Sequence, residues 1–421
     1  KLIITSEKIY HSAIGKAILK AGKECIKSRH SFLASFLLQE KYNVNSFWKP
    51  YIDTLPQYFR NMPIFFTQEE LKELNGSFAL KMIKNRQASL KADYDCIYKA
   101  CKEFRQFSHI DFIWARLVVI TRLFGFEVNG KMTDGLVPFA DMLNHKRPNE
   151  TRWLFDNKDQ CFTIKSSKKL LKGAQIMDSY GRKCNSRYFI NYGFTLDENP
   201  DNQVVYTFNL IPQEIDALYI HKARIVGESA CTHQIPFDHC EQATVNCFNY
   251  LRIIVSNAVE LTSILQANQD IETKRVNIKH VEPINKENEC AVLQMLAVGA
   301  HKALLKYDTT LDEDMSLLKN THQTLTLNQR NCIIMRKGEK EVYHAYIELA
   351  NHAKHWEKMT SFQQFKQYNM QHGLYNDNYG KFSSFTARRQ RYIDYTWQPF
   401  YTDEKRLPLE MTSNAHQELN L

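Results

Sequence analysis

The chain has 421 residues, and its 55 Lys and Arg against 46 Asp and Glu give a formal net charge of +9. Its length predicts two or three domains, and 43% hydrophobic and 24% charged residues are typical of a globular protein. Only 14 Gly and 11 Pro occur, which excludes collagen-like, Gly-linker and Pro-rich chains. No run of 18 or more uncharged apolar residues occurs, so the sequence predicts no membrane-spanning helix, and the mild positive charge alone selects no class of partner.

The first third of the chain is predicted to be mostly helical. A short strand at 2–5 precedes an amphipathic helix, and apolar residues recur at helical spacing over 31–41 and 111–124. Thr67 to Glu70 has the pattern of a capping box, which marks the start of another helix. From 135 to 208 the pattern changes to short β-like runs broken by turns, so we predict an α+β fold.

After residue 210 the helical pattern returns. Apolar residues occupy one broad face over 241–265, and further helices are predicted over 290–305 and 331–353. Thr310 to Glu313 forms a second capping-box pattern. These segments predict a separate helical domain over 210–355.

The last 66 residues, 356–421, have a different composition. Thirteen of them are Phe, Trp or Tyr, while their charges nearly cancel, with 8 basic against 7 acidic residues. This content is too aromatic for a typical disordered tail. We therefore expect the tail to pack on its own chain or on a partner.

Ten cysteines occur, with no Cys-x-x-Cys pair and no secretion signal. Reduced thiols are thus expected in an intracellular protein of the cytoplasm or nucleus, with a mitochondrion or another organelle as the alternative. The stretch 231–247 contains five Cys and His residues and invites a zinc hypothesis. Only Cys231/His233 and His239/Cys240 have tight ligand spacing, so a chance grouping is favoured and no metal is expected. Its members are Cys231, His233, His239, Cys240 and Cys247.

Two polar segments stand out in the β-rich region. Residues 134–145 read DGLVPFADMLNH, and residues 173–181 read GAQIMDSYG, with Tyr192-Gly-Phe194 shortly after. Taken separately, they are a polar turn and a packed tyrosine, since no phosphate loop or nucleophile elbow is present. In this order and spacing they resemble the SET-domain methyltransferases, and within them the Rubisco large-subunit lysine methyltransferase class. Residues 307–314, 327–331 and 336–340 are similar to that class's substrate-binding domain.

The resemblance implies a domain plan and an activity. The plan is a SET domain over 1–209, made of short mixed β-sheets with a helical insert at about 10–125, then an all-helical substrate-binding domain over 210–355 and an aromatic extension over 356–421. The implied activity is transfer of a methyl group from S-adenosylmethionine to a protein substrate held by the helical domain. A stable partner for the aromatic tail is a further expectation, whereas the dispersed Lys and Arg do not favour nucleic-acid binding.

The resemblance also assigns roles to single residues. Tyr180 matches the catalytic tyrosine, and Arg122 matches the residue that meets the cofactor carboxylate, a task that suits the guanidinium fork. Taken alone, Arg122 has a surface ion pair as its alternative, and Phe194 a place in the core. The other cofactor-binding positions are Asp141, Asn144, His145, Tyr192 and Phe194, and the substrate-binding positions are Phe124, Ala140 and Tyr192.

The methylated side chain is a separate question, because the resembled family also contains an actin-histidine methyltransferase. That branch has R-Q-N after the helix and a Trp before D-M-x-N-H. Here Phe124 and Ala140 occupy the corresponding positions and look like those of the lysine-directed members. We therefore expect lysine as the target.

The sequence departs from the resembled class at its start. The class begins with a strand-turn-strand carrying G-x-G, which contacts the methionine end of the cofactor, and no such hairpin precedes Lys1. We expect either a piece of a working enzyme or, as the alternative, an inactive SET-fold scaffold in a large assembly. Lys146 is a smaller departure, since the class has a small residue after Asn-His.

Overall fold

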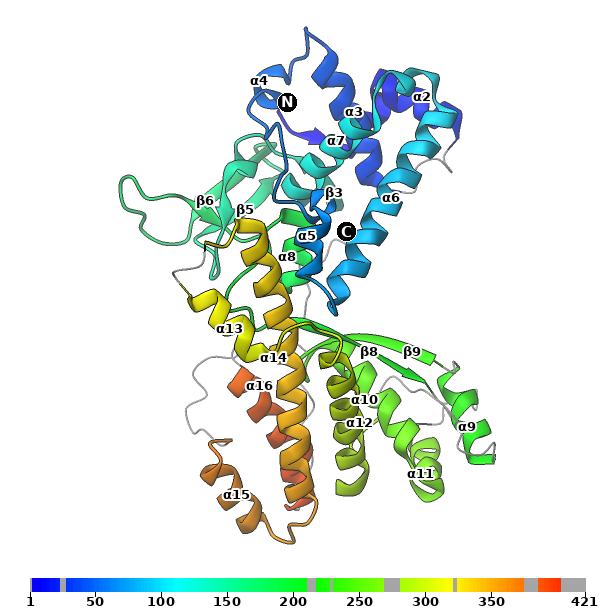
Figure 1. The fold of residues 1–421 in the computed structure, drawn as a ribbon. Coiled ribbons are helices and arrows are strands. Elements are labelled where there is room, and N and C mark those ends of the chain that lie inside the picture. The colour runs from blue at the N-terminus through cyan, green and yellow to red at the C-terminus, as the bar shows by residue number, and fades with distance from the viewer. Residues whose placement is uncertain are drawn as a thin grey trace.

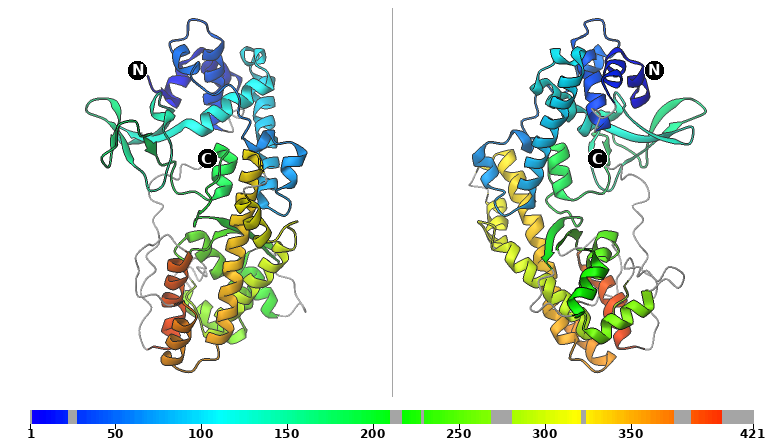
Figure 2. Two further views of the ribbon diagram at one scale, coloured as in Figure 1. Left: turned by 60° about the vertical axis from the view of Figure 1, so that its left-hand side comes forward. Right: turned by 90° about the vertical axis from the view of Figure 1, so that its right-hand side faces the viewer.

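The computed structural model describes residues 2–22, 28–209, 217–227, 230–268, 281–320, 324–374 and 385–402. These residues form two lobes, and helix α14 (Leu327–Trp356) runs from one lobe into the other (Figure 1). Figure 2 shows the same arrangement from two further sides. None of the described helices has the length and apolar content that a membrane span requires.

The first lobe contains most of the predicted N-terminal helices. Helix α3 buries every residue from Ser31 to Leu38, and it packs against the apolar face of α7. The predicted capping box of Thr67 and Glu70 is confirmed at the start of α5. The helices of this lobe are α1 (Ser6–His11), α2 (Ala13–Ala21), α3 (Arg29–Tyr42), α4 (Lys49–Ile52), α5 (Gln68–Lys72), α6 (Phe78–Ala100), α7 (His109–Arg122) and α8 (Asn185–Tyr192), with short turns η2 (Pro63–Phe65), η3 (Lys102–Gln106) and η4 (Ala140–Met142).

Helix α7 ends earlier than the apolar spacing predicts. The helix stops at Arg122, and Leu123 already has the extended backbone of strand β2 (Leu123–Val128). The reason is pairing with strand β3 (Lys131–Leu136), in which Phe124 lies opposite Gly135. Phe124 therefore projects from a strand, and this places its ring beside the cavity described below.

Small sheets complete the first lobe and confirm the predicted α+β fold. Strand β1 (Ile4–Thr5) pairs with β3, so the three-stranded order is β1-β3-β2. Strand β4 (Asn144–His145) pairs in parallel with β7 (Met177–Asp178), and β5 (Thr151–Asp156) pairs with β6 (Cys161–Ser166). Strand β3 ends at Leu136, and the chain turns three residues later at Phe139, which has a φ of 73°.

The second lobe is mostly helical. It also contains an antiparallel hairpin of β8 (Gln203–Asn209) and β9 (Ala230–Pro236), and the second strand of that hairpin lies within the segment predicted to be all-helical. The capping box of Thr310 and Glu313 is confirmed. The helices of this lobe are α9 (Ala217–Val226), α10 (Gln242–Val255), α11 (Ala258–Asn268), α12 (Lys286–Leu304), α13 (Leu311–Lys319), α14, α15 (Phe362–Gln371) and α16 (Phe385–Tyr392), with a π-helical turn η5 (Ile393–Trp397) and η6 (Gln398–Phe400).

The single helix predicted over 241–265 is two helices. Ser256 is extended, and Asn257 and Glu260 then begin α11 with a reciprocal cap. The Asn257 side chain accepts from the Glu260 amide at 2.9 Å, and the Glu260 carboxylate accepts from the Asn257 amide at 2.9 Å. Such a cap satisfies the free amides of a new helix start, which explains the break.

The core of the second lobe includes the described part of the aromatic tail. Trp356, Phe365, Tyr392 and Trp397 are buried together with apolar residues of α10, α12 and α14. The expectation that the tail packs on its own chain is thus confirmed for these residues. Strand β8 belongs to the same core, so the predicted boundary at 209/210 falls inside the β8–β9 hairpin.

A network of charges, buried except for the partly exposed Glu73, joins the two lobes in the first half of α14. Arg336 donates to Asp314 at 2.8 Å and, across the lobe boundary, to Glu73 at 2.5 Å. Lys340 donates to Asp314 at 2.6 Å, and the Asp314 side chain is fully buried. The backbones also approach closely here, because a Cβ at Gly76 would stand 2.6 Å from the Lys306 carbonyl oxygen. The lobes are therefore held at a tight junction.

Candidate functional site

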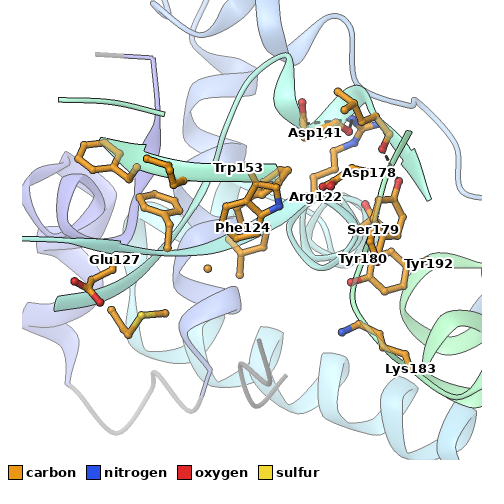
Figure 3. Close-up of a pocket in the computed structure, with 18 of the residues that line it drawn as sticks. Arg122, Phe124, Glu127, Asp141, Trp153, Asp178, Ser179, Tyr180, Lys183 and Tyr192 are labelled. Atoms are coloured by element: carbon orange, nitrogen blue, oxygen red, sulfur yellow. Dashed lines mark hydrogen bonds and ion pairs between the residues drawn. The ribbon is translucent and has the colours of Figure 1, made fainter. Parts of the chain in front are cut away.

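A cavity of about 640 Å³ opens in the first lobe (Figure 3). Strands β2 and β5 form one side of it, and the segment that follows β7 forms the other. The two polar motifs of the sequence approach each other at this second side, because the parallel pairing of β4 with β7 sets His145 opposite Asp178.

Aromatic side chains form the strand side of the cavity. The rings of Phe124 and Trp153 meet edge to face with centroids 5.4 Å apart. Phe162 supports both rings from behind, at 5.4 Å from Phe124 and 5.5 Å from Trp153. This wall offers apolar faces and π-electrons, which suit an alkyl chain or a cation.

Arg122, Asp141 and Tyr51 form a polar group at the cavity. Arg122 donates to the Asp141 carbonyl at 3.0 Å and to its Oδ2 at 3.3 Å, and the Tyr51 hydroxyl donates to the same Oδ2 at 2.6 Å. Burial raises the pKa of Asp141, although Tyr51 and Arg122 oppose that shift. Arg122 Nε and Asp141 Oδ1 are buried and have no partner among the described residues. The group therefore keeps one donor and one acceptor unused.

His145 and Tyr180 are joined through the backbone. The Tyr180 amide donates to His145 Nδ1 at 3.0 Å, so the neutral ring must carry its proton on Nε2. Burial lowers the pKa of His145 to about 4, and the charges of Arg147 and Lys183 add to this effect. The ring is therefore neutral near pH 7, and its buried Nε2 has no partner within the described part of the chain.

The Tyr180 ring lies in an aromatic group with fixed orientation. Its hydroxyl donates to the Leu143 carbonyl at 2.9 Å, and its ring stacks on Tyr192 with centroids 4.9 Å apart. Burial raises the pKa of Tyr180, so the phenol stays protonated at neutral pH. Phe194 stacks on Tyr188 and lies beside His145, completing the aromatic group behind the cavity.

Gly193 makes this packing possible. It ends α8 in the left-handed conformation with a φ of 74°, which a glycine adopts without strain. A Cβ at this position would stand 2.5 Å from Asn61 Nδ2, which donates to the Gly193 carbonyl at 3.1 Å. The glycine thus allows both the turn and the close contact that lead the chain to Phe194.

The structure brings most of the predicted site residues together, but not all of them. His145 and Phe194 pack behind the cavity, whereas Asn144 is exposed on β4 and does not line it. Ala140 is buried with Phe126 and Val137 and does not itself line the cavity, although Phe126 does. The predicted residues that line the cavity are Arg122, Phe124, Asp141, Tyr180 and Tyr192.

Sequence reasoning missed several residues of the site. Tyr51 lies 90 residues before Asp141, and nothing in the local sequence links the two. Trp153 could have been found from the alternation of its strand, because large apolar residues at every second position of β5 and β6 share one face. Lys183 lines the cavity three residues after Tyr180.

Within the described residues, no group of three or more His, Cys, Asp or Glu is placed to hold a metal ion. The histidines of the stretch that invited a zinc hypothesis pack against aromatic rings. His233 lies 5.3 Å from the Tyr250 ring, and His239 stacks on Tyr392 at 3.9 Å.

Comparison with known proteins finds similarity in both lobes. Residues 214–342 match a family model described as "Rubisco LSMT substrate-binding". The fold matches the structures "Crystal structure of the SET domain of LSMT bound to MeLysine and AdoHcy" and "Structure of Rubisco LSMT bound to AdoMet", with TM-scores of 0.66 and 0.65 and 20% identity. Each match covers 90% of this chain and 86% of the other.

Among curated proteins, the chain is similar to actin-histidine N-methyltransferases. Those of Papio anubis, Gallus gallus and Homo sapiens are 27%, 28% and 26% identical to it, over 83% of this chain. The chain spans 60% of the length of these relatives.

Proposed function

We propose that this chain, which has the fold of the LSMT SET-domain structures and a matching substrate-binding segment, transfers a methyl group from S-adenosylmethionine to a lysine of a protein. The observation that carries the proposal is one cavity with an aromatic wall on one side and Tyr180, Arg122 and Asp141 on the other. The helical second lobe supports a protein as the substrate, because its family model is described as substrate-binding.

The polar atoms left unused in the site fit S-adenosylmethionine. Arg122 Nε can donate to a carboxylate and Asp141 Oδ1 can accept from an ammonium, which are the two charged groups of the cofactor's amino-acid end. His145 Nε2 adds a neutral donor for a ring nitrogen or a hydroxyl. When bound, the cofactor supplies a methyl group that its sulfonium already activates.

The residues of this chain have to present a neutral amine. A free lysine has a pKa of about 10.4, so roughly one side chain in 2,500 is neutral at pH 7, a cost of about 4–5 kcal/mol. The wall of Phe124 and Trp153 disfavours the charged ammonium, because it replaces water with apolar surface. The protonated Tyr180 hydroxyl adds no negative charge that would stabilise the ammonium, and it can orient the amine.

The choice of lysine rests on Phe124. The named relatives are actin-histidine methyltransferases, and a histidine target favours a polar partner for the imidazole ring. Phe124 instead gives the cavity an apolar ring held by Trp153 and Phe162. Ala140 supports lysine less directly, since it lies beneath the wall rather than on it.

Amino-acid analysis of the product tests the target. The full-length natural protein is incubated with methyl-labelled S-adenosylmethionine and a cell extract, and the labelled protein is hydrolysed. We expect the label in methyl-lysine, and label in methyl-histidine would contradict the lysine assignment while leaving the transfer proposal intact. The double variant Phe124→Asn with Ala140→Trp should weaken lysine methylation about tenfold or more, and unchanged activity would refute the pocket assignment.

Calorimetric titration of S-adenosylhomocysteine into the same full-length protein tests the cofactor. Binding that weakens about tenfold in Arg122→Gln supports the proposal, since a charge-assisted hydrogen bond contributes about 1.5–3 kcal/mol. Absence of binding in the natural protein would contradict it and favour a SET-fold scaffold.

A further inference from the structure

Two buried aspartates outside the cavity form ion pairs with arginines from distant parts of the chain. Asp201 lies between α8 and β8, and Asp238 follows β9, with side chains only 7% and 2% exposed. Burial alone raises the pKa of Asp201, but the surrounding arginines reverse this and hold the pKa below its ordinary value. Both carboxylates are thus compensated by specific partners rather than by water.

Two of these partners extend the predicted site motifs. Arg147, two residues after His145, donates to Asp201 Oδ2 at 2.6 Å. Arg182, two residues after Tyr180, donates to Asp201 Oδ1 at 2.6 Å and to Asp238 Oδ2 at 3.1 Å. Since the Tyr180 amide also donates to His145, the two motifs are joined to each other and anchored on one carboxylate.

The third partner comes from the C-terminal part of the chain. Arg388 of α16 is 2% exposed, and it donates to Asp201 Oδ1 at 2.6 Å and to the Pro200 carbonyl. Its Nε lies 3.2 Å from Asp238 Oδ2. Helix α16 packs in the second lobe (Figure 1), beyond residue 342 where the match to the substrate-binding model ends.

Removal of the Arg388 guanidinium changes the charge balance around the Asp201 carboxylate. The carboxylate would lose one of its three charged partners, and an incompletely compensated buried charge draws in water or moves toward its remaining partners. Those remaining partners are Arg147 and Arg182. A change at α16 is therefore transmitted to the backbone that presents His145 and Tyr180.

We propose that Arg388 is a positioning residue for the methyl-transfer site, acting through Asp201 on Arg147 and Arg182. The consequence for transfer rests on the proposed function of the cavity, whereas the mechanical link is a property of the fold. Helix α16 then acts as a brace: through Arg388 it holds the segment around Tyr180, which follows β7, in place against β4.

Hydrogen–deuterium exchange of the full-length protein tests the link without cofactor or substrate. The variant is Arg388→Gln, and the matched control is Arg389→Gln on the same helix. Arg389 donates to Glu348 of α14 at 2.7 Å, and the Glu348 side chain is 53% exposed. Loss of Arg389 therefore removes a neighbouring but more exposed ion pair of the same helix without touching Asp201.

We expect amides of 178–187 to exchange about tenfold faster in Arg388→Gln than in Arg389→Gln, consistent with loss of a charge-assisted hydrogen bond. Arg388→Lys keeps the charge without the guanidinium fork, so its exchange should be intermediate, and it provides the comparison if the Gln variant does not fold. Faster exchange confined to α15 and α16, with 178–187 unchanged, would overturn the proposal.

Activity supplies the second readout. Arg388→Gln should lower kcat for methyl transfer to extract protein about tenfold, while binding of S-adenosylhomocysteine changes less than threefold. Faster exchange with unchanged kcat would show that the brace does not position the reacting groups and would also overturn the proposal. If the natural protein transfers no methyl group at all, the proposed function fails while the exchange result still decides the link.

Discussion

The Tyr180 hydroxyl is the only polar atom of its side chain, and the Leu143 carbonyl already fixes its direction. Contacts other than the hydroxyl also hold the residue: the ring stacks on Tyr192, and the backbone amide of Tyr180 donates a hydrogen bond to His145. The hydroxyl can therefore be removed without moving the ring, which makes its chemical contribution measurable.

Tyr180→Phe should reduce kcat by about 10²-fold, because a single oriented hydrogen-bonding group contributes on this scale to a transition state. Binding of S-adenosylhomocysteine should change little. Tyr206→Phe is the matched control, since that buried hydroxyl of the second lobe has no hydrogen-bond partner in the described structure. Equal activity of the two variants would remove Tyr180 from the catalytic role.

The pH dependence of stability reports on His145. Burial lowers its pKa to about 4, compared with about 6.5 in an unfolded chain. The neutral ring thus contributes stability that is complete above pH 6.5 and is lost as the pH falls toward 4. Urea unfolding between about pH 7 and 4.5 should show a steeper loss in the natural protein than in His145→Asn. If the unfolding free energy fell equally with pH in both proteins, this would contradict the lowered pKa of His145.

Element ends, rather than element interiors, shape the site. Helix α7 stops one residue before β2, helix α8 ends at Gly193, and β7 ends at Asp178. These ends place Arg122 and Tyr180 at the cavity and Phe194 in the aromatic group behind it. Because an end depends on pairing or packing elsewhere in the chain, its position is sensitive to a single backbone change.

Gly193→Ala should destabilise the protein more than Gly173→Ala. Both glycines have positive φ, 74° and 84°, so both substitutions introduce backbone strain of about 1–2 kcal/mol. Only Gly193 faces a close neighbour, at 2.5 Å, while nothing lies within 4 Å of a Cβ at Gly173. The excess free energy of unfolding should be about 1–3 kcal/mol, measured by denaturant titration. Equal losses would mean that Asn61 moves aside freely.

The junction between α13 and α14 offers a second test at this scale. Asp314 is fully buried and bonds both Arg336 and Lys340. Asp314→Ala should cost about 3–5 kcal/mol of unfolding free energy, because it leaves two cations without their shared anion. The exposed Asp312, on the same helix, should change stability by about 0.5 kcal/mol or less when replaced by Ala. Similar losses in the two variants would argue against the network.

For the whole molecule, the fold class and the order of the lobes could be predicted from periodicity and motif order. Tyr180 and Arg122, which line the cavity, could be selected from the sequence only through the resemblance to a known family, which also supplied their expected roles. Tyr51 could not, since its contact with Asp141 depends on three-dimensional packing across 90 residues. The break at Ser256 was missed for a related reason, because a reciprocal cap can start a new helix without interrupting the apolar pattern.

The Asp201 cluster also has a consequence for biosynthesis. Its arginines at 147 and 182 leave the ribosome well before Arg388, which follows Arg182 by 206 residues. At about 5–20 residues per second, this interval lasts roughly 10–40 s. During that time Arg147, Arg182 and Asp201 lack the third arginine of the cluster, so the loop that carries Tyr180 is completed only late in synthesis. Chain termination before residue 388 would leave that state permanent.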